Sequence, residues 1–152
     1  MNHDLLIQRL DSAPDRLLRL CVDLSPEDAA QQPGKGEWSV VQVIGHLVEG
    51  DRDTFLPRLR RMLTEDRPVF ESRERTRAGE SDLEVLLGAF ESARREAIGI
   101  LRELDPPSWT RAGVSPSRGP VTIEEYALTM ADHDDEHLAQ IGAAKMAVEL
   151  SK

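Results

Sequence analysis

The chain has 152 residues, the length of one ordinary domain. Its net charge of −9 argues against binding to nucleic acid or to anionic membranes, because both partners need a positive protein surface. No apolar run approaches the ~18 residues that a membrane span requires. The single cysteine, Cys21, excludes an internal disulfide and is expected to be a buried thiol. We therefore expect one cytoplasmic domain over residues 1–152 that binds neither nucleic acid nor a membrane.

Helix signals are dense and strand signals are nearly absent. Four segments match the pattern in which a Ser or Thr caps a helix and an acidic residue or Gln three positions later reaches back to it. These segments begin at Ser25, Ser39, Ser81 and Thr122. With them we predict helices over about 3–22, 26–32, 39–64, 81–104 and 122–150. Pro14 lies inside the first span, where it either kinks the helix or starts it afresh.

Four long helices with little else predict an all-α four-helix bundle. Residues 65–80 and 105–121 form connections that are longer than a simple antiparallel hairpin of helices needs. At ~3.3 Å per residue, either connection is long enough to run back along a bundle. The lengths alone therefore leave open which of the two crosses over.

His133 and His137 stand four residues apart on the last predicted helix. Side chains at this spacing share one helix face, so the two imidazoles are able to bind one metal ion. Short patterns of this kind also arise by coincidence, and both interpretations stay open at this point. Asp134 falls within the apolar stripe of the same helix, and a buried carboxylate needs a cation, a metal or hydrogen-bond donors.

His46 lies on the second long helix, off the edge of its apolar stripe and between Gly45 and Gly50. This position suits the wall of a cleft between helices, or else an exposed side chain. The HExxH motif of zinc proteases is absent, and no Glu lies three residues before His46, His133 or His137 as in di-iron bundles. Phosphate-binding loops of the Walker type, GxSxG motifs and cysteine pairs are also absent from the sequence.

Three segments together resemble the DinB-like (DinB/YfiT-like) superfamily of helical-bundle metalloproteins. They are Gly36-Glu37-Trp38-Ser39-Val40-Val41 leading to His46-Leu47, Arg118 to Glu125, and Ala131 to Ile141 with its two histidines. Their order and spacing cover nearly the whole chain.

The resemblance implies a bundle with an up-down-down-up course and a long crossover between the second and third long helices, which assigns residues 65–80 to the crossover. It also implies one divalent metal ion held by three histidines, and His46, His133 and His137 occupy those positions. Three imidazoles accept several first-row ions, so zinc, nickel and iron are all candidates.

Characterised members of the superfamily include thiol-cofactor transferases and mycothiol-dependent maleylpyruvate isomerases. The resemblance therefore implies a metal-dependent transferase that uses a low-molecular-weight thiol against an electrophilic small molecule, and a homodimer is compatible with it. One alternative is a metal-binding or stress-response bundle without turnover. Another is a purely structural bundle whose histidines are packed or exposed.

Four further residues are candidates for this site. Asp134 is expected to orient a histidine or a bound water, and Glu49, one turn after His46, either accepts a proton or is solvated. Arg118 precedes the last helix, where it either holds an anionic cofactor group or is solvated. Trp38 either packs at the start of its helix or contacts the cofactor or substrate.

Overall fold

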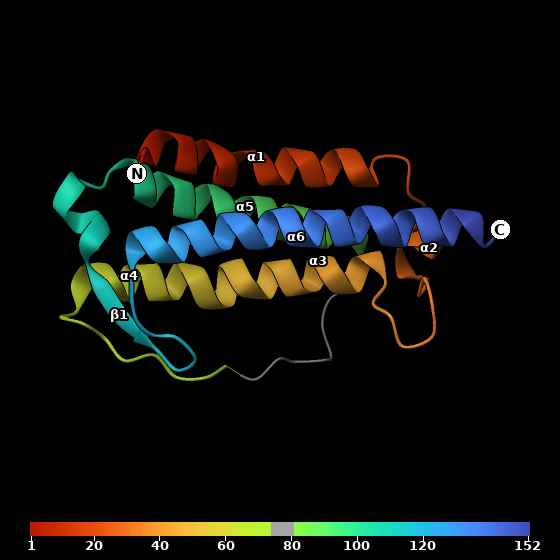
Figure 1. Ribbon diagram of the computed structural model, residues 1–152. Coiled ribbons are helices and arrows are strands. Elements are labelled where there is room, and N and C mark those ends of the chain that lie inside the picture. The colour runs from red at the N-terminus through yellow and green to blue at the C-terminus, as the bar shows by residue number, and fades with distance from the viewer. Residues whose placement is uncertain (74–80) are drawn as a thin grey trace.

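The computed structural model describes residues 1–73 and 81–152, and Figure 1 shows its long helices lying side by side. The elements are α1 (His3–Cys21), α2 (Pro26–Ala30), α3 (Val40–Val48), the π-helical segment η1 (Glu49–Phe55), α4 (Leu56–Thr64), α5 (Leu83–Arg102), the 3₁₀ helix η2 (Pro106–Thr110), β1 (Ala112–Ser115), β2 (Gly119–Thr122) and α6 (Ile123–Leu150). The expected helical bundle is confirmed.

The course of the chain is up-down-down-up, as expected. α1 packs against α5 and α6, and α3 packs against the same two helices. His3 Nε2 lies 2.6 Å from Glu124 Oε2, and Lys145 Nζ lies 2.5 Å from Asp23 Oδ1, so α1 and α6 run in the same direction. After α4 the chain turns back along the bundle (Figure 1), which makes this connection the crossover. Residues 74–80 of the predicted crossover lie outside the described residues.

Three of the four expected helix caps are confirmed. Ser25 accepts a hydrogen bond from the backbone of Asp28, and Thr122 accepts one from Glu125. Ser39 and Gln42 form a complete capping box at the start of α3. The prediction that Ser81 caps the third long helix is wrong, because Asp82 accepts from the Val85 amide instead and α5 begins one residue later. Aspartate caps helices as well as serine does, so the sequence did not separate the two.

Pro14 neither ends nor restarts α1, which continues through it from His3 to Cys21. A proline has no N–H to donate, so the carbonyl of Leu10, four residues earlier, lacks its helical partner. Arg94 supplies the missing donor, with Nη1 2.7 Å from the Leu10 oxygen. The proline thus opens an acceptor on α1 that a buried side chain of α5 uses.

The connection 105–121 is more ordered than the sequence predicted, because it holds η2 and the antiparallel hairpin of β1 and β2. The crossover adds to this hairpin, since the Phe70 amide donates to the Val114 carbonyl at 2.9 Å. A Cβ atom at Gly113 would lie 2.5 Å from the Phe70 ring, so any other residue there would force that ring to move. Gly119 begins β2 at φ +73, a conformation that favours glycine. Strands of four residues that contain Gly and Pro carry little strand signal.

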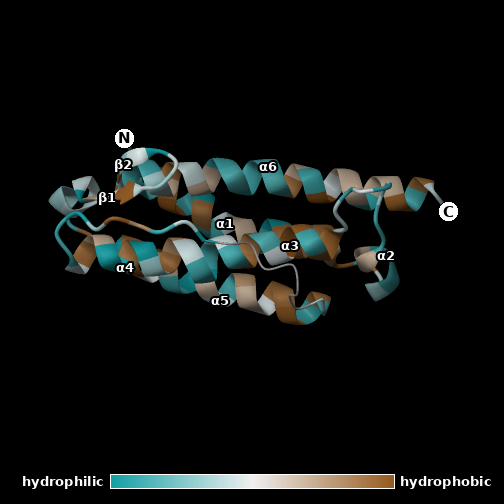
Figure 2. Ribbon diagram, turned by 90° about the horizontal axis from the view of Figure 1, so that it is seen from below, coloured by the Kyte–Doolittle hydropathy of each residue, from teal (hydrophilic) through white to brown (hydrophobic). Residues whose placement is uncertain are grey.

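The buried apolar side chains form two clusters along the bundle. One is centred on Leu10, Phe55 and Leu101 at the hairpin end, and the other contains Leu17, Ile44 and Phe90. In Figure 2, hydrophilic and hydrophobic stretches alternate along the long helices, as expected for amphipathic helices. Cys21 belongs to the second cluster, and burial raises the pKa of its thiol to about 11.

A layer of buried charge separates the two clusters. Arg94 of α5 donates to both carboxylate oxygens of Asp51 at 2.7 and 3.0 Å, and to both of Asp134 at 2.7 and 2.9 Å. Together with the bond to Leu10, these contacts occupy all five N–H groups of the guanidinium. Each of the three side chains is at most 2% exposed.

Burial affects the pKa values of both the acidic and the basic side chains in this layer. Burial raises the pKa of the Asp134 carboxyl, and the hydrogen bonds from Arg94 oppose that rise. Burial alone would lower the pKa of Arg94, but its hydrogen bonds and ion pairs with Asp134 and Asp51 keep that pKa above the usual value. The arginine therefore stays charged, and its positive charge is shared by two carboxylates.

Among the residues that the structure describes, none of the helices combines the length and apolar character that crossing a bilayer takes.

Arg94→Met is expected to lower the free energy of unfolding by about 3–5 kcal/mol, because it leaves two buried carboxylates without a cation. Urea unfolding followed by circular dichroism measures the change. Arg95→Met is the matched control on the exposed neighbour and should shift stability by at most ~0.5 kcal/mol. The triple variant Asp51→Leu, Arg94→Met, Asp134→Leu should regain most of the loss. Equal stability of Arg94→Met and Arg95→Met would contradict this account of the core.

Candidate metal centre

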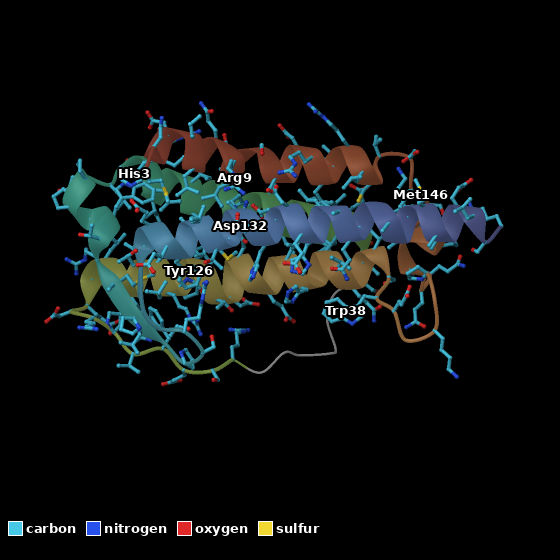
Figure 3. All side chains as sticks on the ribbon, viewed as in Figure 1. His3, Arg9, Trp38, Tyr126, Asp132 and Met146 are labelled. Atoms are coloured by element: carbon cyan, nitrogen blue, oxygen red, sulfur yellow. The ribbon has the colours of Figure 1, made fainter. Side chains whose placement is uncertain are left out.

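Residues 132–137 of α6 are rich in acidic side chains and histidines, and these side chains point in three directions. Asp132 and Asp135 turn toward α1, where Arg9 Nη2 donates to them at 3.1 and 3.0 Å; Arg9 and Asp132 lie side by side in Figure 3. Asp134 turns into the core, onto Arg94. His133 and His137 are left on the side that faces α3. The helical period thus sorts neighbouring residues into surface pairs, a buried ion pair and a histidine face.

The three candidate histidines come together between α3 and α6. The ring centres of His46 and His137 are 4.8 Å apart, and those of His133 and His137 are 6.0 Å apart. His46 and His137 are half-buried, whereas His133 is exposed. His46 is therefore at a cleft wall, one of the two positions that its sequence pattern allowed.

A change of helical period follows His46 directly. Within η1 the amide of Leu56 donates to the carbonyl of Asp51, five residues back, which is the wide turn of a π-helix. Along the continuous helical run of α3, η1 and α4, one row of buried residues recurs at every fourth position. These residues are Leu47, Asp51, Phe55 and Leu59. A regular α-helix would rotate such positions steadily away from the core. The wider turn keeps Asp51 facing Arg94 directly after the helix that bears His46.

The spacing of the rings fits a shared ion. Two imidazoles bound to one tetrahedral ion at about 2.0–2.1 Å have ring centres roughly 5 Å apart, close to the observed 4.8 and 6.0 Å. The nitrogen atoms are less well placed. Within residues 1–73 and 81–152, no three His, Cys, Asp or Glu side chains already form a set that could hold an ion. The histidines therefore fit a metal by type and proximity, and the rings must turn to bind one.

Gln140 contacts one ring nitrogen of His137. Its side-chain Oε1 lies 3.0 Å from His137 Nδ1. An amide oxygen only accepts hydrogen bonds, so this contact favours the tautomer in which Nδ1 carries the proton and Nε2 keeps its lone pair. Gln140 was not among the residues predicted from the sequence, although its position three residues after His137 on the same helix was a usable signal.

Two cavities meet at the histidines, and all three rings line both. A pocket of about 410 Å³ extends toward the hairpin and is lined also by Glu49 and Arg118. A more open cleft of about 770 Å³ extends toward the start of α3 and is lined also by Trp38. The structure thus brings Glu49, Arg118 and Trp38 around the histidines.

The contacts of these residues differ in kind. Trp38 lies just before α3 (Figure 3), with its ring centre 5.5 Å from that of His46. Arg118 Nη1 donates to Thr129 Oγ1 at 2.6 Å, and Glu49 is half-buried. The carboxylate of Asp134 is hydrogen-bonded to Arg94, a partner that the sequence analysis did not identify. The catalytic and binding roles expected of these four residues stay predictions.

Comparison with known proteins relates most of the chain to one family. The sequence model of the DinB superfamily matches residues 9–141. A protein of Oceanobacillus iheyensis named "Putative metal-dependent hydrolase" is 27% identical over 140 residues, which cover 89% of this chain and 81% of the relative. A protein of Bacillus mycoides with the same name is 23% identical over 143 residues, covering 91% and 82% of the two chains.

Two solved structures share the fold. YfiT from Bacillus subtilis, described as "a probable metal-dependent hydrolase with an unusual four-helix bundle topology", superposes with a TM-score of 0.86 at 21% identity, covering 95% of this chain and 86% of YfiT. TT2238, described as a four-helix bundle protein, superposes with a TM-score of 0.67 at 22% identity, covering 93% and 99%.

The hydrogen bond from His137 to Gln140 predicts one tautomer. Long-range ¹H–¹⁵N spectra of the metal-free protein should show the neutral form of His137 with its proton on Nδ1. Gln140→Leu should shift His137 toward the Nε2-protonated form, because the acceptor is lost. Gln8→Leu, at an exposed site on α1, is the control and should leave the spectrum unchanged. A His137 signal that is insensitive to Gln140→Leu would contradict the assignment.

Proposed function

Because the chain belongs to the DinB superfamily, we propose that it is a metal-dependent enzyme in which His46, His133 and His137 hold one divalent ion. The observation that supports this most directly is the gathering of the three rings, 4.8 and 6.0 Å apart, at the meeting point of two cavities. The names of the two relatives point to metal-dependent chemistry as well.

A divalent ion bound by three neutral imidazoles supplies a nucleophile at neutral pH, because it lowers the pKa of a coordinated thiol or water. The residues of the chain then have distinct tasks. Gln140 keeps the Nε2 lone pair of His137 available. Glu49, which lines the pocket beside His46, accepts the proton that the nucleophile releases. Asp134 acts as a positioning residue, because its ion pair with Arg94 fixes the rotation of α6.

We further propose that the nucleophile is a low-molecular-weight thiol and that the reaction is its transfer to an electrophilic small molecule. The two cavities support this, because two different molecules are able to approach the histidines from opposite ends of the groove between α3 and α6. The pocket of about 410 Å³ is of the size that holds small molecules. Hydrolysis is the second candidate, favoured by the names of the two relatives. The homodimer expected from the sequence stays a prediction.

The metal site predicts a defined stoichiometry. Protein purified without a histidine tag and dialysed against Zn²⁺, Ni²⁺ or Fe²⁺ should bind one ion per chain, as measured by elemental analysis. His133→Ala and His137→Ala should each abolish this, because two imidazoles do not complete the site. His3→Ala is the matched control, since His3 stacks on Trp109 with ring centres 4.0 Å apart and takes no part in the site. Equal metal content in all four proteins, or none in any, would overturn the site.

Turnover separates the candidate reactions. With a panel of thiols and 1-chloro-2,4-dinitrobenzene, the metal-loaded protein should accelerate formation of the carbon–sulfur bond as chloride leaves with the electrons of the carbon–chlorine bond. Product absorbance measures the rate, and the variant with all three histidines replaced by Ala is the control. Acceleration of ester or amide hydrolysis without thiol transfer would favour the hydrolase. Rates equal to the control in both assays would leave a metal-binding protein without turnover.

A further inference from the structure

The hairpin end of the pocket is rich in arginine, although the chain as a whole carries a net charge of −9. Arg58 of α4, Arg73 of the crossover and Arg118 of the hairpin turn all line it. Arg73 has a carboxylate nearby, because its Nη2 lies 3.4 Å from Asp53 Oδ2 and its Nη1 donates to the Asp53 carbonyl at 3.0 Å, although Asp53 is also paired with Arg52. The question is which group balances the positive charges of Arg58 and Arg118.

Arg58 is held in place by neutral groups. Its Nη2 donates to the carbonyl of Glu71 at 2.9 Å, and its Nη1 lies 3.5 Å from the hydroxyl of Tyr126. The guanidinium also lies over the ring of Phe70, 5.0 Å from the ring centre. These contacts fix the direction of the side chain without cancelling its charge.

Arg118 reaches the same region from the opposite wall. Its Nη1 donates to Thr129, one turn after Tyr126 on α6. Across residues 1–73 and 81–152, neither Arg58 nor Arg118 has a carboxylate at ion-pair distance. Burial raises the pKa of the Tyr126 hydroxyl, and the charges of Arg58 and Arg118 oppose this rise, so both guanidinium groups act on one point of the pocket.

The same face of α6 connects this point to the histidines. Tyr126, Met130, His133 and His137 all line the pocket. At a rise of 1.5 Å per residue, the positions of Tyr126 and Thr129 lie about 6–10 Å along the helix from His133. A small molecule is therefore able to reach both ends at once. Glu49 also lines this pocket.

Building on the proposed function, we propose that Arg58 and Arg118, with the hydroxyls of Tyr126 and Thr129, bind the negatively charged group of the molecule that reacts at the histidines. The substrate class is then a small molecule with a carboxylate or phosphate about 6–10 Å from its reacting atom. Guanidinium groups suit both anions, because their paired N–H donors match the oxygen atoms of each.

A series of thiols tests the distance and the charge together. Protein loaded with Co²⁺ is titrated with 3-mercaptopropionate, 6-mercaptohexanoate and the neutral 6-mercaptohexanol, and the charge-transfer absorption of the cobalt–thiolate contact reports binding. We expect 6-mercaptohexanoate to bind about tenfold more tightly than 6-mercaptohexanol at low salt, because a hydrogen bond to a charged group is lost in the alcohol. The shorter 3-mercaptopropionate should show a smaller advantage.

Variants of the two arginines identify the group responsible. Arg58→Gln and Arg118→Gln should each reduce the preference for the hexanoate, and the double variant should abolish it while 6-mercaptohexanol binds as before. Arg102→Gln is the matched control, since Arg102 is an exposed arginine of α5 that pairs with Asp11 outside the pocket. Equal affinity of the wild-type protein for the charged and neutral thiols, or an unchanged preference in the double variant, would overturn the proposal.

A second measurement needs no metal and keeps the two proposals separable. Inorganic phosphate and acetate are titrated into metal-free protein, and the Nε–H signals of the arginines are followed by NMR. Shifts of the Arg58 and Arg118 signals that saturate, and that vanish in the double variant, would support the anion site. This holds even if no cobalt–thiolate absorption appears, because the missing absorption would refute only the metal proposal. The tighter of the two probes indicates the anion. No response to either probe would overturn the anion site, whatever the metal experiment shows.

Discussion

The guanidinium of Arg94 joins all four long helical segments of the bundle. It extends from α5 and contacts the Leu10 carbonyl of α1, Asp51 of η1 and Asp134 of α6. Charge buried in an apolar core is costly unless every donor and acceptor is paired, so these elements are held to one mutual arrangement. Asp134 lies next to His133, and Asp51 lies five residues after His46. The ion pairs therefore also set how the histidine faces of α3 and α6 meet.

Two prolines contribute to this arrangement by interrupting the helical hydrogen bonds. Pro14 leaves the Leu10 carbonyl without a donor from its own helix, and Arg94 takes that place. Pro57, just after the π-helical turn, leaves the Asp53 carbonyl open in the same way, and Arg73 donates to it at 3.0 Å. In each case an arginine from another segment donates a hydrogen bond to the carbonyl that the proline leaves without a helical donor. Local irregularities of the helices thus become points of attachment for the core and for the crossover beside the pocket.

Much of the fold was predictable because its signals are local. Capping residues marked the helix starts, and the four-residue spacing of His133 and His137 placed two rings on one face. The burial of Asp134 was also predictable, together with its need for a cation, a metal or hydrogen-bond donors. The identity of the cation was not predictable, because Arg94 and Arg95 are adjacent in the sequence and only packing buries the first and exposes the second. The π-turn of η1 and the short hairpin left no periodic pattern, so the wide turn and the pocket wall emerged only in three dimensions.

The claim that the rest of the functional account depends on is that His46, His133 and His137 bind one ion together. A crystal structure of zinc-loaded protein, with diffraction data collected on both sides of the zinc absorption edge, tests this most directly. We expect one anomalous peak per chain, about 2.0–2.1 Å from a nitrogen of each of the three rings. Fully loaded crystals with the peak elsewhere, or with three rings that share no peak, would contradict it.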